Sequence, residues 1–80
     1  MEILKFGTNG CVPCLGLTHW LKQFDVEITS YDITKNLSLV KLYNLKAVPV
    51  LIRLDGGVET GRVVGFNESK LEEVKTLLEL

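Results

Sequence analysis

The two cysteines of this 80-residue chain, Cys11 and Cys14, lie where the spacing of apolar residues changes from that of a strand to that of a helix. The pattern predicts a buried strand over residues 2–6 and a turn over residues 7–10, which are rich in turn-forming types. From Cys11 to about Phe24 the apolar residues recur at helical spacing. One helical turn would bring the two sulfur atoms close enough to bond.

The next segment predicts a second strand and a second helix. Residues 26–31 are rich in β-branched and aromatic types, which favours a strand. Asp32 or Thr34 can cap a helix that runs to about Asn44. The inner side of this helix is expected to consist of Leu39, Val40, Leu42 and Tyr43.

A third strand is predicted at residues 50–54, which are nearly apolar on both faces and are therefore expected at the centre of a sheet. Asp55-Gly56-Gly57 is typical of a hairpin turn, and residues 58–64 form the return strand. Gly61, in the middle of that return strand, indicates a bulge.

The last helix begins with Asn67 as its cap, or with Ser69 and Glu72 as a capping box. Its apolar stripe is Leu71, Val74 and Leu78. The predicted element order is therefore β-α-β-α-β-β-α. We expect an α/β fold in which residues 1–80 form a single domain, with a mixed four-stranded sheet flanked by three helices. The first two strands should be parallel, and the last two antiparallel.

Composition and charge exclude several classes of function. The formal net charge is −1 with both signs interspersed, so neither nucleic acid nor an anionic membrane surface is an expected partner. No apolar run approaches the ~20 residues that span a bilayer, and Met1 leads directly into the first strand without a targeting segment. We therefore expect a cytoplasmic protein, in which a disulfide is more often catalytic than structural.

The position of the two cysteines predicts different roles for them. Cys11 lies at the expected start of a helix, where free N–H groups and the helix dipole favour a thiolate. Cys14 lies one turn deeper on the core stripe, so Cys11 is the predicted nucleophile and Cys14 the resolving thiol. With only two cysteines the chain cannot form a Cys₄ zinc site, and with His19 as the only histidine it cannot form a Cys₂His₂ site. The alternatives are an inert pair, or half of a zinc or iron–sulfur site shared between two chains.

A proline stands directly before the predicted central strand, where proline is normally excluded. The Val48-Pro49 bond is expected to be cis, which would present a backbone edge to a substrate. This expectation depends on the combination with Cys-x-x-Cys, because most X-Pro bonds are trans.

Taken together, these motifs resemble the thioredoxin/glutaredoxin superfamily over nearly the whole chain. The matching segments are Phe6 with residues 11–14, residues 43–49, residues 57–65 and residues 69–71. The resemblance implies a minimal thioredoxin fold, with Val48-Pro49 lying against the cysteine pair. It also implies catalysis by Cys11 and Cys14 and a substrate-binding set consisting of Val12, Pro13, Val48, Pro49 and Gly65.

Several residues depart from the patterns of both subfamilies. Gly10 stands where thioredoxins have tryptophan, and Val50 where they usually have threonine after the cis proline. Thr8 stands where glutaredoxins commonly have lysine, and Asn67-Glu68 does not match their acidic pair. Lys5 takes the place of the buried aspartate of thioredoxins. Its ammonium group either reaches water along the sheet, or stays near the second cysteine and stabilises a thiolate there.

The leading hypothesis is a dithiol electron carrier that reduces protein disulfides, without a metal and with no cofactor other than the Cys11–Cys14 disulfide. Its reductant would be a thioredoxin-reductase-like flavoenzyme or glutathione, and the chain is expected to be a monomer. Three alternatives remain open: a thioredoxin-fold binding subunit of another machine, a glutathione-dependent glutaredoxin and a cluster-binding dimer.

Overall fold

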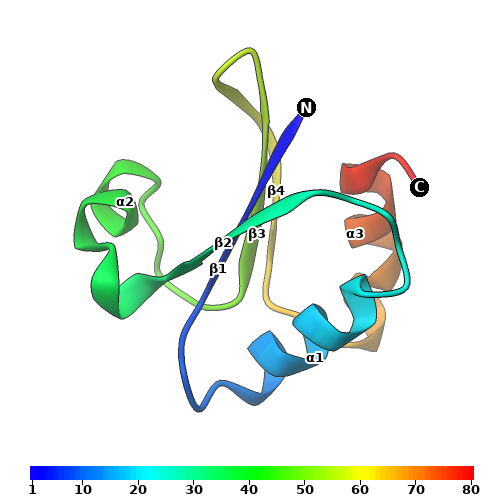
Figure 1. Cartoon of the computed structure of the whole chain (residues 1–80), viewed down its shortest axis with the longest axis horizontal. Coiled ribbons are helices and arrows are strands. Elements are labelled where there is room, and N and C mark those ends of the chain that lie inside the picture. Colours follow the sequence, from blue (N-terminus) through cyan, green and yellow to red (C-terminus); the bar gives the residue numbers. More distant parts are fainter.

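Four strands form one mixed sheet in the order β2-β1-β3-β4, in a computed structural model that describes residues 1–80 (Figure 1). The strands are β1 (Glu2–Gly7), β2 (Ile28–Asp32), β3 (Val50–Asp55) and β4 (Val58–Val64). β1 pairs with β2 in parallel and with β3 antiparallel, and β3 and β4 form an antiparallel hairpin. The predicted mixed sheet, with an apolar central strand, is confirmed.

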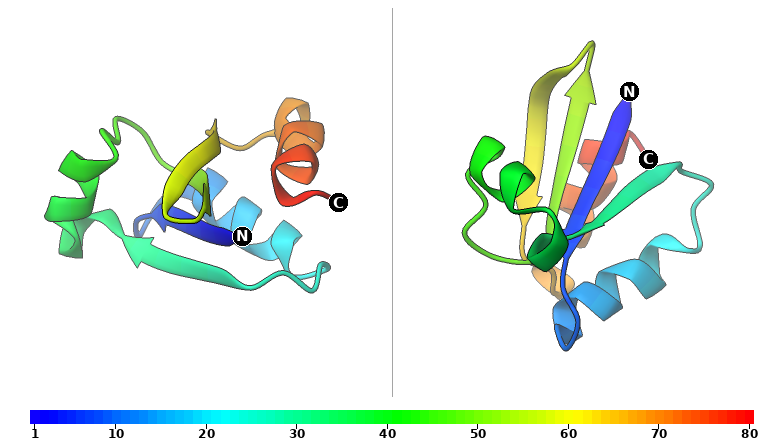
Figure 2. Two further views of the ribbon diagram at one scale, coloured as in Figure 1. Left: turned by 90° about the horizontal axis from the view of Figure 1, so that it is seen from above. Right: turned by 60° about the vertical axis from the view of Figure 1, so that its left-hand side comes forward.

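Three α-helices cover the two faces of this sheet. They are α1 (Val12–Leu21), α2 (Leu37–Leu42) and α3 (Leu71–Leu78), and two short 3₁₀ turns, η1 (Ile33–Lys35) and η2 (Glu68–Lys70), precede α2 and α3. α1 and α3 lie on one side of the sheet and α2 lies alone on the other (Figure 2). The predicted β-α-β-α-β-β-α order is therefore also confirmed.

The alternation of side chains along the strands produces two separate cores. One core lies between the sheet and the helices α1 and α3, and consists of Ile3, Leu17, Leu21, Leu51, Val63, Val74 and Leu78. The other lies under α2 and consists of Leu4, Phe6, Val50, Ile52 and Leu54. Successive residues of β1 and β3 therefore point to opposite faces of the sheet. Because both faces are covered by helices, β3 is apolar on both.

The helices are shorter than the sequence predicted. α1 ends at Leu21, three residues before Phe24. The Asp32 side chain caps the turn η1, accepting a hydrogen bond from the Thr34 backbone N–H at 2.9 Å. The predicted second helix is divided after this turn, because Asn36 leaves the helical conformation, with φ −137° and ψ 53°. α2 follows as a separate helix of six residues. Leu39 and Tyr43, four residues apart, pack on the sheet as predicted, whereas Leu42, also predicted to face inward, is 71% exposed.

The hairpin follows the prediction except in one detail. Gly56 and Gly57 adopt positive φ angles of 61° and 81°, as the predicted turn requires. Arg53 pairs with Gly61 and Leu54 pairs with Glu59, so the additional residue of the bulge is Thr60. A Cβ atom on Gly61 would lie 2.8 Å from Leu77 Cδ1 of α3, so the glycine allows α3 to approach β4 closely.

Two side chains near the ends of elements complete the fold. Asn67 accepts a hydrogen bond from the Ser69 N–H at 2.9 Å, so the first of the two predicted caps is present, although it caps η2 rather than α3. Arg62 on β4 reaches across to α2, where Nη2 donates to the Tyr43 carbonyl at 2.9 Å. This hydrogen bond ties the sheet to the beginning of the segment that leads to Pro49.

We expect Arg62→Met to lower the free energy of unfolding by about 1–2 kcal/mol, because the Tyr43 carbonyl would lose a charged donor in a half-buried position. Urea unfolding measures this loss. Glu59→Gln is the matched control, because Glu59 pairs with the Arg62 guanidinium at an exposed site and its loss should cost under ~0.5 kcal/mol. Equal effects of the two substitutions would show that the bond to Tyr43 contributes nothing.

Candidate active site

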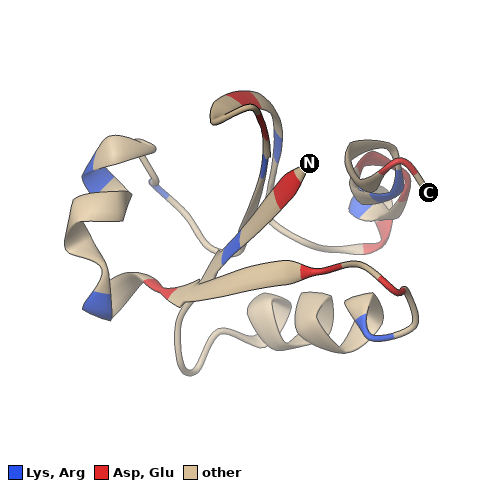
Figure 3. Ribbon diagram, turned by 45° about the horizontal axis from the view of Figure 1, so that its top comes forward, with Lys and Arg blue, Asp and Glu red and all other residues tan.

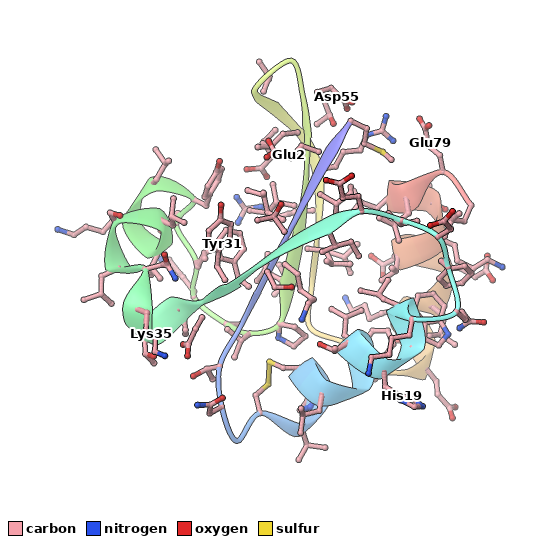
Figure 4. All side chains as sticks on the ribbon, viewed as in Figure 1. Glu2, His19, Tyr31, Lys35, Asp55 and Glu79 are labelled. Carbon is pink, nitrogen blue, oxygen red and sulfur yellow. A yellow bond between two sulfur atoms is a disulfide. The ribbon has the colours of Figure 1, made fainter.

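A disulfide joins Cys11 and Cys14 at the start of α1, where it is drawn as a yellow bond in Figure 4. Cys11 is the N-cap residue of α1, and its Sγ accepts a hydrogen bond from the Cys14 backbone N–H at 3.2 Å. The two Cα atoms are 5.2 Å apart, within the range that a disulfide requires. Pro13 lies in the first helical turn, where a missing N–H leaves no hydrogen bond broken.

The two sulfur-bearing residues differ in their exposure. Cys11 is half-buried at the tip of the helix, whereas Cys14 is buried, at 6% exposure, above Leu17 and Leu21 on the core side of α1. Unpaired N–H groups at the helix N-terminus favour negative charge on Cys11 Sγ once the disulfide is reduced. Cys11 is therefore more accessible to a partner molecule than Cys14.

β1 and β4 end, and β3 begins, at the same end of the sheet. Phe6 pairs with Val50, and Val50 pairs with Val64. The neighbouring residues Gly7, Pro49 and Gly65 therefore lie at this end of the sheet. Here the Gly65 N–H donates to the Pro49 carbonyl at 2.8 Å. The Val48-Pro49 bond is cis, as the resemblance implied.

Gly7 connects this end of the sheet to the cysteines. A Cβ atom on Gly7 would lie 3.4 Å from both Cβ and Sγ of Cys14, so the buried sulfur packs on the end of β1. Gly65 adopts a φ of +82°, which favours glycine.

The predicted substrate-binding residues fall into two groups. Val12 and Pro13 are exposed beside the disulfide, with Val12 at 76%, whereas Val48 and Gly65 are half-buried and Pro49 is buried. The structure joins Pro49 and Gly65 by a hydrogen bond, and their contact with a substrate stays a prediction. Leu15, which the sequence analysis did not select, is 67% exposed. Its position one residue after Cys14, off the core stripe, was the signal for this exposure.

The segment that carries the disulfide has no acidic side chain, lysine or arginine of its own. Residues 6–21 contain none of these types, and Figure 3 shows the ribbon of α1 in tan, the colour of uncharged residues, over nearly its whole length. His19 is exposed on α1 and is labelled in Figure 4. Phe66 packs against Trp20, with their ring centroids 5.7 Å apart, and so covers the core on this side.

A cavity of about 220 Å³ lies on the other side of Cys14, between β1, β2 and α1. Lys5 and Thr18 line it together with Cys14. Lys5 Nζ donates to Thr18 Oγ1 at 2.6 Å, and Thr18 Oγ1 donates to the Cys14 carbonyl at 3.0 Å. Burial lowers the pKa of the Lys5 ammonium group below its ordinary value. Neither of the two predicted environments of Lys5 included Thr18.

The structure contains neither a cluster of metal-ligating side chains nor a membrane-crossing helix. No group of three or more His, Cys, Asp or Glu side chains is placed so that it could hold a metal ion. No helix has the length and apolar character needed to cross a membrane.

Comparison with known proteins gives the family. No protein-family model matches the chain. The SPbeta prophage-derived thioredoxin-like protein YosR of Bacillus subtilis is 31% identical over 75 residues, which cover 92% of this chain and 94% of that protein. The chain belongs to the thioredoxin/glutaredoxin superfamily. Thioredoxin H2-1 of rice is 25% identical over 78 residues, and the chain spans only about half of its length, 56%.

Solved thioredoxin structures share the fold. Thioredoxin 1 from Thermosipho africanus superimposes with a TM-score of 0.77 at 26% identity, covering 99% of this chain and 91% of that one. Thioredoxin from Malassezia sympodialis gives a TM-score of 0.81 at 19% identity, covering 99% and 75% respectively. The family and the Cys11–Cys14 disulfide together support a thiol–disulfide oxidoreductase.

Two departures from the thioredoxin pattern have a structural counterpart. Gly10, which replaces the tryptophan before the first cysteine, has a φ of +78°, a conformation that side-chain-bearing residues rarely adopt. Val50, which replaces the threonine after the cis proline, is 1% exposed in the core under α2. Both residues therefore suit the backbone and burial of their positions.

Proposed function

We propose that this chain is a dithiol electron carrier that reduces protein disulfides through Cys11 and Cys14. The observation that carries the proposal is the unequal exposure of the pair: an accessible sulfur at the helix N-terminus is bonded to a buried sulfur one turn below it. This arrangement suits a nucleophile that meets the substrate and a second thiol that releases it.

The proposed reaction has two exchanges. The Cys11 thiolate attacks one sulfur of the substrate disulfide, which breaks the substrate S–S bond and releases one substrate thiolate. The Cys14 thiolate then attacks Cys11 Sγ, forms the Cys11–Cys14 bond and releases the second substrate thiolate. The substrate gains two electrons and the cysteine pair loses two, and the protons lost by the two cysteines balance those taken up by the substrate thiolates.

The surface around Cys11 supports a protein as the substrate. It is uncharged from Phe6 to Leu21, and Val12 and Leu15 expose apolar side chains on either side of the disulfide. An apolar and neutral surface can dock peptide segments of different charge. The edge formed by Pro49 and Gly65 would lie against the backbone of such a segment, together with Val12, Pro13 and Val48.

The proposed reductant is a thioredoxin-reductase-like flavoenzyme. The curated relatives of this chain are named as thioredoxins or as thioredoxin-like, and Thr8 replaces the lysine common in glutaredoxins, which favours the flavoenzyme over glutathione. We place the protein in the cytoplasm as a monomer that needs no cofactor beyond its own disulfide.

The test is the reduction of insulin, coupled in parallel to a flavin-dependent thioredoxin reductase and to glutathione with glutathione reductase. We expect the wild type to turn over with the flavoenzyme, and the double variant Cys11→Ser/Cys14→Ser to lose turnover in both assays while it keeps its circular dichroism spectrum. Turnover with glutathione alone would identify the protein as a glutaredoxin. No turnover with either reductant would favour a binding subunit and overturn the proposal.

A further inference from the structure

Lys5 lies on the face of β1 that packs against α1. Side chains alternate along a strand, and Leu4 and Phe6 belong to the core under α2, whereas Ile3 belongs to the core under α1. Lys5 and Gly7 therefore share the face of Ile3, and Gly7 is the position on which the Cys14 sulfur packs. Lys5 therefore lies two residues before Gly7, on the same face of β1 as the position that contacts the Cys14 sulfur.

Thr18 links the Lys5 ammonium group to the backbone of Cys14. Thr18 lies one helical turn after Cys14, and its hydroxyl both accepts from Lys5 Nζ at 2.6 Å and donates to the Cys14 carbonyl at 3.0 Å. The hydroxyl has one proton to donate and free lone pairs to accept, so both bonds form at once. A flexible lysine is in this way fixed on the inner surface of the cavity that also reaches Cys14.

The surroundings leave this ammonium group without a neutralising partner. Lys5 forms no ion pair, whereas the other partly buried cations each lie within ion-pair distance of a carboxylate: Arg53, Arg62, Lys70 and Lys75. From β2, Tyr31 and Asp32 line the same cavity, and from the end of α1, Lys22 lines the neighbouring one. The Asp32 carboxylate accepts hydrogen bonds from the Thr34 N–H and hydroxyl at 2.9 and 2.7 Å.

We propose that Lys5 is a positioning residue whose ammonium group, held by Thr18, stabilises the thiolate of Cys14 when this residue attacks the mixed disulfide. The inference rests on the proposed function and adds to it the group that activates the second thiol. Cys11 has the helix N-terminus for this purpose, but Cys14 lies inside the first turn with its own N–H already bonded to Cys11 Sγ.

The step that Lys5 assists is the second exchange. Cys14 gives its proton to water in the cavity, and its thiolate forms a bond to Cys11 Sγ while the bond from Cys11 to the substrate sulfur breaks. The substrate leaves as a thiolate and takes up a proton. Lys5 is not consumed in this step. Burial lowers the pKa of Lys5 below its ordinary value, so its assistance is lost as the pH rises through a pKa that is lower than that of an exposed lysine.

The decisive measurement is the titration of Cys14 alone. In Cys11→Ser the only thiol is Cys14, and a carbon-13 label on the cysteine β-carbon gives one NMR signal that follows its ionisation. We expect Lys5→Met, added to this background, to move the midpoint upward by about one pH unit, because an opposite charge close to a thiolate favours the charged form by at least that amount. Lys5→Gln serves as a second neutral variant if Lys5→Met does not fold.

The control variants separate charge from packing. Lys5→Arg keeps the cation and should leave the midpoint within a few tenths of a unit, and Lys22→Met removes an exposed lysine of the neighbouring cavity and should also leave it unchanged. An unchanged midpoint in the folded neutral variants would overturn the proposal, as would a shift in Lys5→Arg equal to that in Lys5→Met.

A kinetic measurement shows the effect in the reaction. With insulin in single turnover at pH 7, Lys5→Met should form the mixed disulfide at the wild-type rate but resolve it about threefold more slowly. The tenfold loss of thiolate is partly offset, because a thiol of higher pKa is a stronger nucleophile. An unchanged resolution rate would count against the proposal. If the wild type fails to reduce insulin, only the proposed function fails, because the titration midpoint needs no substrate.

Discussion

Cys14→Ser is expected to stop insulin reduction after the first exchange and to leave the protein covalently joined to its substrate through Cys11. Cys11 keeps its place as the N-cap of α1 in this variant, and the N–H group that donates to its Sγ belongs to the backbone of residue 14, which serine retains. The nucleophile therefore still attacks, but the thiol that would release the substrate is missing. Non-reducing gel electrophoresis and mass spectrometry measure the adduct, whose formation should approach one equivalent.

Cys11→Ser is the matched control, because it removes the other sulfur from the same turn. Only Cys14 remains, at 6% exposure, so we expect no adduct and less than ~1% of wild-type turnover, since the thiolate is the only nucleophile in thiol–disulfide exchange. A stable adduct through Cys14 in this control, with none through Cys11 in the other variant, would reverse the assignment of the two roles.

The parts of the fold that the sequence predicted are those that depend on local pattern. The strand–turn–helix unit around Cys11 follows from a change of apolar period, and the hairpin from Asp55-Gly56-Gly57. The central place of β3 follows from an apolar run that only a sheet buried on both faces can cover. Each of these features can be predicted without knowing which helices and strands pack against one another.

The parts that were missed depend on how elements pack. The sequence predicted one helix from a cap at Asp32 or Thr34 to about Asn44, but the backbone leaves the helical conformation at Asn36 and α2 has only six residues. Leu42 is exposed because the face of α2 that packs on the core is formed by Leu39 and Tyr43. The bulge that Gly61 indicated is present, with the neighbouring Thr60 as its additional residue. The close approach of Leu77 in α3 to Gly61 could not be predicted from the strand pattern.

The candidate site shows the same division. The different exposure of Cys11 and Cys14 follows from helical spacing alone, and the cis Val48-Pro49 bond followed from the combination of two motifs. The hydrogen bonds that link Lys5 through Thr18 to the Cys14 carbonyl could not be predicted from the sequence. These bonds depend on how α1 is oriented on β1, because that orientation brings residue 18 close to residue 5. No local pattern in either segment predicts the orientation.

Phe6→Ala is expected to cause the largest loss of stability of any single substitution discussed, about 3–5 kcal/mol. Phe6 is fully buried, at 0% exposure, and its ring packs on Tyr31 and Tyr43 with centroid distances of 5.4 and 5.8 Å. Tyr43 ends α2 and begins the segment that leads to Pro49. A cavity at Phe6 therefore loosens α2 as well as removing apolar contacts, and domains of this size have only about 5–10 kcal/mol in total.

Urea unfolding of the oxidised protein measures this loss, and Phe24→Ala is the matched control. Phe24 is half-buried at the edge of the other core, where it packs on Trp20 with a centroid distance of 4.9 Å, so we expect a cost of under ~2 kcal/mol from its smaller buried area. Because Phe6 lies under α2 and the disulfide lies at the start of α1, the folded fraction of Phe6→Ala should still form the Cys11–Cys14 bond. Equal costs for the two substitutions would show that the core under α2 is loosely packed and does not hold the segment before Pro49 in place.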